Sequence, residues 1–347
     1  MQANDNRAPS VMGFHFPIPR PGFRPERLIA LARERIAEMR LDLRGRTILT
    51  EAATGVYVVT PIIAALAGAR RVFAVARDSR HGSTSEAVAW LHDIAERAGV
   101  ADTISIIDAV PHAFLDQVDI VTNSGHIRPI NDAIIDALPP HAVVALMFEA
   151  WEWRSGDIDY AACERRSLPV VGVNERHETI DVFSYLGPLA IRLLHDAGVP
   201  VYRSRIALVC DNEFNTSLLA GLVGQGAHVT QARSVRDLPP KPYEAVLLAL
   251  RPADNHARLD EEDARRLAAM APGAIVAQFW GDVDREALAA AGLQIWPPNA
   301  PATGHMAILL SEIGPDAVVR LQAGGLKAAQ VVLDDAEREE PGLAQIL

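Results

Sequence analysis

The sequence is poor in aromatic residues and cysteines, and it has no long apolar run. Aromatic side chains make up 5% of the 347 residues and the formal net charge is -11, so we expect no nucleic-acid partner. Because only Cys163 and Cys210 occur, a disulfide framework and a cysteine-rich zinc site are excluded. No stretch approaches the ~18 uninterrupted apolar residues of a membrane helix, and the opening residues do not resemble a signal peptide. We therefore expect no membrane partner and a cytoplasmic location.

Apolar residues, in contrast, are abundant enough for two hydrophobic cores, at 49% of the chain. Strand-like and helix-like segments alternate in two successive series. This alternation predicts an α/β fold of two Rossmann-like domains, each with a doubly wound, mainly parallel sheet, and an interdomain cleft. The expected divisions are an N-terminal arm with a first helix (1–45), a first Rossmann-like domain (46–178), a bridging helix (179–203), a second Rossmann-like domain (204–314), and a C-terminal helix with an acidic tail (315–347).

Apolar periodicity and turn residues predict the individual elements of both domains. The first domain is expected to have helices at 25–40, 61–69, 83–98 and 131–138, and strands at 47–50, 71–77, 103–107, 118–123, 142–148 and 170–173. Pro61 is suited to the first position of its helix. For the second domain we expect strands at 205–210, 228–232, 245–250, 274–279 and 293–296, with a helix at 260–270. The bridging helix is expected at 180–197 and the C-terminal helix at 315–333.

The segment GDIDYAACERRSLPVVGVNE at 156–175 carries a family resemblance. It places an Asp and paired alanines before a late strand and an Asn, at Asp159, Ala161, Ala162, Val170, Val171 and Asn174. This order resembles the end of the substrate domain in D-2-hydroxyacid dehydrogenases of the formate/glycerate type. The resemblance implies an NAD(P)-dependent oxidoreductase that acts on a small carboxylated metabolite in the interdomain cleft. It also implies that His305 is the proton donor, with Glu149 or Glu175 as its orienting carboxylate.

The turn that opens the second domain departs from that family. A dinucleotide-binding turn is rich in glycine because the pyrophosphate must approach backbone N–H groups, but residues 210–217 contain no glycine. We expect the acidic Asp211 and Glu213 to repel a diphosphate, and the following strand offers Gln231 in place of a ribose-binding acid. The candidate cofactor contacts in this turn are Asp211, Asn215 and Thr216. The departure favours an alternative, a non-catalytic small-molecule-binding protein that has lost its cofactor site.

A second candidate cofactor turn lies in the first domain. Glu51, Thr54 and Gly55 precede a predicted helix, and Asp78 follows the next predicted strand. This arrangement resembles an S-adenosylmethionine-dependent enzyme as much as a dinucleotide fold. In that alternative the loop approaches the amino acid part of S-adenosylmethionine and Asp78 binds the ribose hydroxyls.

Polar residues after the predicted strand at 118–123 are candidates for chemistry. His126 is a candidate acid or base, while Asn123 and Arg128 add donors for a substrate. Ligands of open α/β sheets bind at the carboxyl ends of strands, where this loop is expected to lie. Alternatively, the loop only caps the helix that follows it.

Two further segments supply candidate substrate contacts. In 148–154, Glu149 can act as a base or bind an ammonium group, and Arg154 can bind a substrate carboxylate; alternatively, the tryptophans pack and the charges are solvated. In 174–177, the candidates are Glu175, Arg176 and His177, or the segment is only a helix cap. The histidines are too scattered along the chain to predict a metal site. The proline-rich arm and the apolar bridging helix favour a homodimer.

Overall fold

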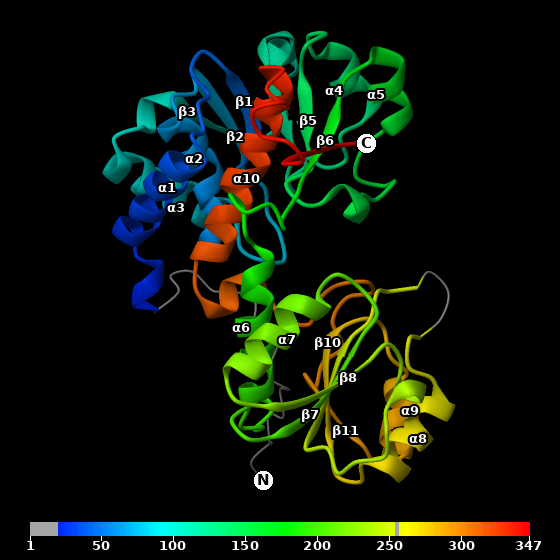
Figure 1. Ribbon diagram of the computed structural model, residues 1–347. Helices are drawn as coiled ribbons and strands as arrows, with labels where there is room; N and C mark the ends of the chain where they lie inside the picture. Colours follow the sequence, from blue (N-terminus) through cyan, green and yellow to red (C-terminus); the bar gives the residue numbers. More distant parts are fainter. Residues whose placement is uncertain (1–19, 254–256) are drawn as a thin grey trace, which may run out of the picture. The chain divides into compact units, whose positions relative to one another are not determined.

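The computed structural model describes residues 20–253 and 257–347 (Figure 1). The predicted α/β fold with two Rossmann-like sheets is confirmed. Contacts divide the chain into unit 1, which comprises residues up to Val182 and Gly314–Leu347, and unit 2, Phe183–Ile313. Most of the expected N-terminal arm, residues 1–19, lies outside the described residues.

Unit 1 contains a seven-stranded sheet in the order β12-β6-β5-β4-β1-β2-β3. All its neighbouring strands are parallel except the pair of β12 and β6. Burial on both faces explains why the parallel strands are nearly continuous apolar runs. The strands are β1 (Thr47–Glu51), β2 (Arg71–Val75), β3 (Ile104–Ile107), β4 (Ile120–Thr122), β5 (Val143–Ala145), β6 (Val170–Val173) and β12 (Ala344–Ile346).

The helices of unit 1 form two packed groups. One group joins α1, α2, α3 and α10, and the other joins α4 and α5. Ser83 and Glu86 form a reciprocal capping box at the start of α3, which fixes where that helix begins. The helices are α1 (Pro25–Glu38), α2 (Val59–Leu66), α3 (Thr84–Ala98), α4 (Asp132–Ala137), α5 (Tyr160–Arg166) and α10 (Asp316–Leu333), with 3-10 turns at Pro21–Phe23, Gly55–Val58, Ala101–Thr103, His112–Gln117 and Ala150–Glu152.

The strand order of unit 1 reverses between β1 and β4. From β1 the chain proceeds outward to β2 and β3, and it then returns to place β4 on the other side of β1, followed by β5 and β6. Such a reversal is a topological switch point, and ligands of open α/β sheets bind beside the carboxyl ends of the strands there. The residues that follow β1 and β4 are therefore in the position that favours a site.

Helix α10, drawn in orange in Figure 1, packs against β5 and β6 and beside α1 and α2. Its Gly324 and Gly325 permit this approach, because a Cβ at Gly325 would lie 2.7 Å from Met147 Sδ and one at Gly324 would lie 3.0 Å from Ile180 Cδ1. The buried Gln322 of this helix accepts a hydrogen bond from Thr60 Oγ1 at 2.7 Å. Within the described ranges, no helix is both long enough and apolar enough to cross a membrane.

Three local predictions differ from the structure. Helix α2 begins at Val59, so Pro61 is its third residue and not its first. The expected bridging helix begins at Leu186 and ends at Asp196, because Asp181 adopts a left-handed φ of 47° and Phe183–Tyr185 form a 3-10 turn. After the acidic residues of the tail, the chain forms β12, a strand that the sequence did not predict and that pairs antiparallel with β6.

Unit 2 contains a five-stranded parallel sheet in the order β11-β10-β9-β7-β8. Its strands are β7 (Arg205–Cys210), β8 (His228–Ala232), β9 (Ala245–Ala249), β10 (Ile275–Trp280) and β11 (Gln294–Trp296). Its helices are α6 (Leu186–Asp196), α7 (Asn215–Gly224), α8 (Glu261–Met270) and α9 (Arg285–Ala290), with 3-10 turns at Phe183–Tyr185, Val235–Asp237 and Leu310–Ile313.

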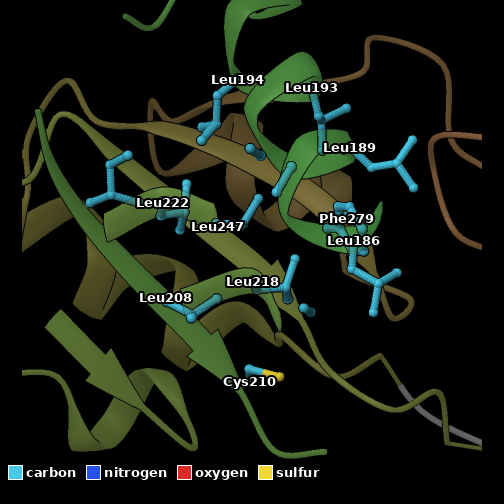
Figure 2. Packing of buried hydrophobic residues seen from close by; sticks show 14 of the residues in the cluster. Leu186, Leu189, Leu193, Leu194, Leu208, Cys210, Leu218, Leu222, Leu247 and Phe279 are labelled. Atoms are coloured by element: carbon cyan, nitrogen blue, oxygen red, sulfur yellow. The ribbon is translucent and has the colours of Figure 1, made fainter. Parts of the chain in front are cut away.

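A leucine-rich core holds α6 and α7 against one face of this sheet. Figure 2 shows Leu189 and Leu193 of α6 above Leu218 of α7, Leu208 of β7 and Leu247 of β9, and these five residues are buried. The two helices approach so closely that a Cβ at Gly221 would lie 2.4 Å from the Cα of Gly187. The opposite face of the sheet packs on a separate cluster that includes residues of α8 and α9.

Candidate functional site

Polar residues of unit 1 collect along the carboxyl edge of its sheet. Glu51 ends β1, Asn123 follows β4, Glu149 comes after β5, and Glu175 comes after β6. Because these strands are parallel neighbours, their carboxyl ends share one edge. The structure thus brings together residues that the sequence analysis selected from four separate segments.

His126 lies at the switch point and contacts the ends of two strands. Its backbone N–H donates to Glu51 Oε2 at 3.0 Å, and its ring Nδ1 lies 3.1 Å from the carbonyl oxygen of Val75, the last residue of β2. A carbonyl only accepts hydrogen bonds, so we assign the ring hydrogen to Nδ1. Nε2 of a neutral His126 is then the nitrogen that can accept a proton.

Arg128 fixes the orientation of the Asn123 amide. Its Nε donates to Asn123 Oδ1 at 2.8 Å, and its Nη2 donates to the Asn123 carbonyl oxygen at 2.8 Å. A guanidinium group only donates, so the side-chain oxygen must face Arg128 and the amide nitrogen must face away. Asn123 is 2% exposed, and its Nδ2 has no hydrogen-bond partner within residues 20–253 and 257–347. A buried donor without an acceptor costs about 1–3 kcal/mol, and such exceptions require an explanation.

The Arg128 guanidinium lies among several charges. Burial lowers its pKa from the ordinary value, while the negative charges of Asp157 and Glu51 oppose that shift and the positive charge of Arg154 adds to it. Its Nε lies 3.4 Å from Asp157 Oδ2. Arg154 itself is exposed. The positive charges of Arg128 and Arg154 therefore act on each other.

Glu149 is buried, and its carboxylate is fully engaged. Its Oε1 accepts the backbone N–H of Glu175 at 3.2 Å and lies 3.4 Å from Arg176 Nε, while its Oε2 accepts the indole N–H of Trp151. The side chain is 1% exposed. Glu149 thus holds the segments after β5 and β6 together.

Glu152 and Glu175 lie beside Glu149, and the pKa of each is raised. Burial, followed by the charge of Glu149, raises the pKa of Glu152 to about 7. Burial, followed by the charges of Glu152 and Glu149, raises the pKa of Glu175 well above its ordinary value. Burial also raises the pKa of Tyr57 to about 12, with further contributions from Glu51 and Glu175. These effects link the carboxylates after β5 and β6 to Glu51 at the switch point.

Two residues of this edge, Tyr57 and His81, were not predicted from the sequence, whereas Glu152 belongs to the segment 148–154 that the sequence analysis selected. Burial and Arg80 lower the pKa of His81, the charge of Glu51 opposes this shift, and His126 adds to it. Tyr57 stands in an apolar run, so it carries no local signal of its environment. The proximity of Tyr57 and His81 to segments already selected was the only usable indication.

The first-domain cofactor loop is occupied by contacts within unit 1. Asp78 Oδ1 accepts the backbone N–H of Thr84 at 2.7 Å and its hydroxyl at 2.8 Å, and these bonds lower the pKa of Asp78. Thr54 Oγ1 donates to the carbonyl of His81 at 3.0 Å, and the carbonyl of Gly55 accepts from the Trp90 indole at 2.8 Å. These contacts give the S-adenosylmethionine alternative no support.

The remaining candidates of 174–177 have local contacts. The backbone N–H of Thr179 donates to His177 Nδ1 at 3.3 Å, and Asn174 Nδ2 donates to the carbonyl of Gly342 at 2.8 Å. Arg176 pairs with Glu149. His305 belongs to unit 2, where its backbone N–H donates to the carbonyl of Ala302 at 2.9 Å.

The acidic turn of unit 2 is neutralised, contrary to the expected repulsion of a diphosphate. Asp211 Oδ2 lies 2.7 Å from Arg258 Nη2, and Glu213 Oε2 lies 2.7 Å from Arg251 Nη2. Hydrogen bonds from the Arg251 backbone and from Asn212 and Arg258 lower the pKa of Asp211 although burial opposes them. Both arginines follow β9 in the chain, which explains why the turn alone appeared anionic.

The same turn does not offer a glycine-lined cradle for pyrophosphate. Asn212 Oδ1 accepts the backbone N–H of Phe214 at 3.1 Å, and Asn212 Nδ2 donates to the carbonyl of Ala249 at 2.7 Å. Asn215 Nδ2 donates to Gln231 Oε1 at 3.0 Å, and Thr216 is an exposed residue in the first turn of α7. Side chains therefore occupy positions that a glycine-rich turn would leave open.

A cavity of about 510 Å³ lies beside this turn, at the carboxyl ends of β7 and β8. Arg233 is exposed there, and no ion pair of its guanidinium is found in the described part of the chain. With Asp211 and Glu213 paired, this guanidinium gives the cavity a positive group for a phosphate. The cavity is lined by Cys210, Asp211, Asn212, Glu213, Asn215, Gln231, Ala232 and Arg233.

Comparison with known proteins gives similarity of structure only. No family model and no curated protein matches the sequence. A dipicolinate synthase polypeptide from Bacillus halodurans is similar over 84% of this chain and 98% of its own, with 12% identity and a TM-score of 0.51. A dipicolinate synthase polypeptide from Bacillus subtilis is similar over 86% of this chain and 100% of its own, with 14% identity and a TM-score of 0.54.

An NAD-dependent formate dehydrogenase from Staphylococcus aureus, solved in complex with NAD, is also similar in structure. It matches over 84% of this chain and 94% of its own, with 14% identity and a TM-score of 0.45. The expected tandem Rossmann-like architecture is confirmed, and the two dipicolinate synthase polypeptides share this fold. Identities this low carry the fold alone.

Proposed function

We propose that the protein is an NAD(P)-dependent oxidoreductase whose unit 1 binds a small carboxylated metabolite at the carboxyl edge of its sheet. The observation that carries this proposal is the Asn123 amide nitrogen, which is buried, oriented by Arg128 and without an acceptor in the described residues. A substrate carboxylate is an acceptor that fits this donor. The neighbouring Arg128 and Arg154 guanidinium groups favour the same negative charge.

In this proposal His126 transfers the proton of the reaction. Its Nδ1 hydrogen bond to Val75 leaves Nε2 to take a proton from the substrate group that is oxidised, or to return it in reduction. Glu51 holds the loop through the His126 backbone N–H and places a negative charge beside it. A nicotinamide, when bound, supplies the hydride acceptor or donor. His305 remains a second candidate acid/base group, contributed by unit 2.

The test of substrate binding is Asn123→Asp, which keeps the oxygen that faces Arg128 and replaces the free donor by an acceptor. A panel of small 2-hydroxy, 2-oxo and 2-amino acids is first titrated against the wild-type protein by calorimetry. We expect the variant to bind the active ligand at least ~10-fold more weakly, a loss of about 1.4 kcal/mol or more, because an acceptor then faces the carboxylate. Unchanged affinity in a folded variant, or a panel without any ligand, contradicts the proposal.

For the nucleotide, we propose NADP in preference to NAD, held in the cavity beside Arg233. The strand β8 ends without an acid that could bind the ribose diol of NAD, and an arginine at this place suits a 2′-phosphate. We expect Arg233→Ala to weaken NADP binding at least ~10-fold and to leave NAD binding unchanged, because only the phosphate loses a charged partner.

The matched control is Lys241→Ala, which removes an exposed cation from a separate pocket of unit 2 beside the first residues of β7 and β9. Fluorescence titration with NADP and NAD measures both variants. Equal losses in the two variants, or tighter binding of NAD than of NADP by the wild type, count against the assignment.

A further inference from the structure

The Glu175 side chain is largely buried, and its carboxyl group has no polar partner in the described residues. The residue is 8% exposed, and its side chain makes neither a hydrogen bond nor an ion pair within the described ranges. Its backbone is held on both sides, since its N–H donates to Glu149 Oε1 at 3.2 Å and its carbonyl accepts from Val182 N at 2.9 Å. The backbone of Glu175 is thus fixed by hydrogen bonds that do not involve its carboxyl oxygens.

The neighbouring charges do not explain this group. The nearby Arg176 side chain pairs with Glu149, at 3.4 Å, and Glu149 and Glu152 add negative charge around Glu175. Burying a carboxyl group without a hydrogen bond or a cation is costly, so the arrangement calls for a positively charged ligand. No cluster of three side chains suited to a metal ion occurs among the residues described. An organic cation is therefore the better fit.

The spacing of the strands sets the length of a ligand that could reach from Asn123 to Glu175. Asn123 follows β4 and Glu175 follows β6, and β5 lies between these strands. Two strand spacings amount to roughly 10 Å. Two hydrogen bonds of about 3 Å then leave roughly 4 Å between the charged groups of a ligand. An ammonium and a carboxylate that are joined through one or two carbon atoms satisfy this spacing.

We propose that Glu175, assisted by Glu152, binds the ammonium group of an amino-carboxylate substrate whose carboxylate is held by the amide nitrogen of Asn123. The substrate class is therefore a small amino acid and not the corresponding hydroxy acid. This inference rests on the proposed function, because it uses the same carboxylate contacts. It extends that function by assigning the acidic end of the edge to a second substrate group.

Binding of an ammonium group should release protons from the protein. The charged and titratable groups around Glu175 are Glu149, Glu152 and Arg176 after β5 and β6, and Tyr57 with Glu51 near the switch point. Because the pKa of Glu152 is about 7 and that of Glu175 is raised, both groups hold protons in mildly acidic solution. An ammonium ion favours the ionised carboxylates, so its binding should become tighter as the pH rises toward 8.

The experiment compares matched ligand pairs on the full chain by calorimetry: alanine with lactate, aspartate with malate, and glutamate with 2-hydroxyglutarate, each as both enantiomers. At least one amino member should bind ~10-fold more tightly than its hydroxy partner. Near pH 6.5 it should release on the order of one proton, read from the dependence of the binding enthalpy on the ionisation enthalpy of the buffer. Glu175→Gln should remove this preference and the proton release, and Glu152→Gln should weaken both.

The control is Glu178→Gln, which changes an exposed acid three residues away. A melting temperature for each variant establishes that it is folded. Hydroxy acids that bind as tightly as amino acids, with Glu175→Gln without effect, overturn the inference and leave the proposed function standing. If neither member of any pair binds the wild-type protein, the proposed function fails together with the inference.

Discussion

Three glutamates within one segment of the sheet edge differ in chemical state because their neighbours differ. Glu149 satisfies both oxygens with an indole N–H, a backbone N–H and Arg176, and it holds the loops together. Glu175 has the same functional group and almost the same burial, but its side chain has no polar partner in the described residues. Glu152 lies beside them with a pKa near neutrality. The ionisation state of each glutamate therefore depends mainly on the hydrogen-bond donors and charges that surround it.

Stability between pH 5 and 8 should report on Glu152. Its pKa rises from an ordinary 4.5 to about 7 in the folded protein, so the folded state binds the proton more tightly than the unfolded chain. This contribution is complete below about pH 4.5 and is lost as the pH rises through 7. Glu152→Gln keeps a neutral side chain, so the wild type should lose on the order of 1–2 kcal/mol relative to the variant between pH 5 and 8.

Urea unfolding at several pH values measures this difference, with Glu178→Gln as the control at an exposed position. Parallel stability curves for the wild type and Glu152→Gln would show that Glu152 titrates alike in the folded and unfolded states.

Among the secondary-structure elements, the crossing of α6 and α7 depends on two glycines. A Cβ at Gly221 would lie 2.4 Å from Gly187 Cα, so Gly221→Ala must push the helices apart. We expect a loss of at least ~2 kcal/mol in the stability of unit 2, because its leucine core lies beneath this crossing. Gly224→Ala is the matched control, since a Cβ there meets nothing within 4 Å and alanine favours the helix by up to about 1 kcal/mol.

Hydrogen exchange of the β7, β9 and β10 amides measures the two glycine variants. The expected order of protection is Gly224→Ala, then wild type, then Gly221→Ala. Equal protection in Gly221→Ala and the wild type would mean that the crossing can relax without cost.

The positions of the helices and strands were largely predictable from the sequence. The ion pairs and the raised pKa values of the site were not. The strands at 205–210 and 228–232 were predicted to the residue. The first is an apolar run between a charged start and a polar turn, which is a local signal, and the second follows the helix that succeeds it in a β-turn-α-β order. The pairing of Asp211 with Arg258 joins residues that are separated in the chain by α7, β8 and β9, so the residues of the turn alone predicted the wrong electrostatic character. Similarly, the raised pKa of Glu152 requires burial beside Glu149, and burial follows from packing that the sequence does not specify locally.

Unit 1, considered within the whole molecule, is assembled from both ends of the chain. Strand β12 pairs with β6, and Leu343 accepts the backbone N–H of Asn174 at 2.9 Å. The backbone N–H of Ala150 donates to Gln345 Oε1 at 2.8 Å. The C-terminal strand thus supports the two loops that carry Glu149 and Glu175.

Deletion of residues 343–347 should lower the stability of unit 1 and weaken its ligand binding. The amides of unit 2 should keep their protection from hydrogen exchange. The loss should be on the order of 3 kcal/mol, because several backbone groups of the edge lose their partners at about 1 kcal/mol each. Gln345→Ala is the milder variant, which removes only the acceptor of Ala150 and should cost about 1 kcal/mol. Hydrogen exchange resolved by segment distinguishes the units. Equal loss of protection in both units, or none in β6, contradicts this assignment.

The late position of α10 in the chain has a consequence for biosynthesis. Unit 2 is complete at Ile313, whereas α10 and β12 of unit 1 follow it. On the ribosome, unit 2 can therefore fold before α10, the helix that packs on β5 and β6, has been synthesised. The nascent protein carries an uncovered apolar sheet face through the translation of about 130 residues. Chaperone capture during synthesis should be directed to unit 1, although its strands are translated first.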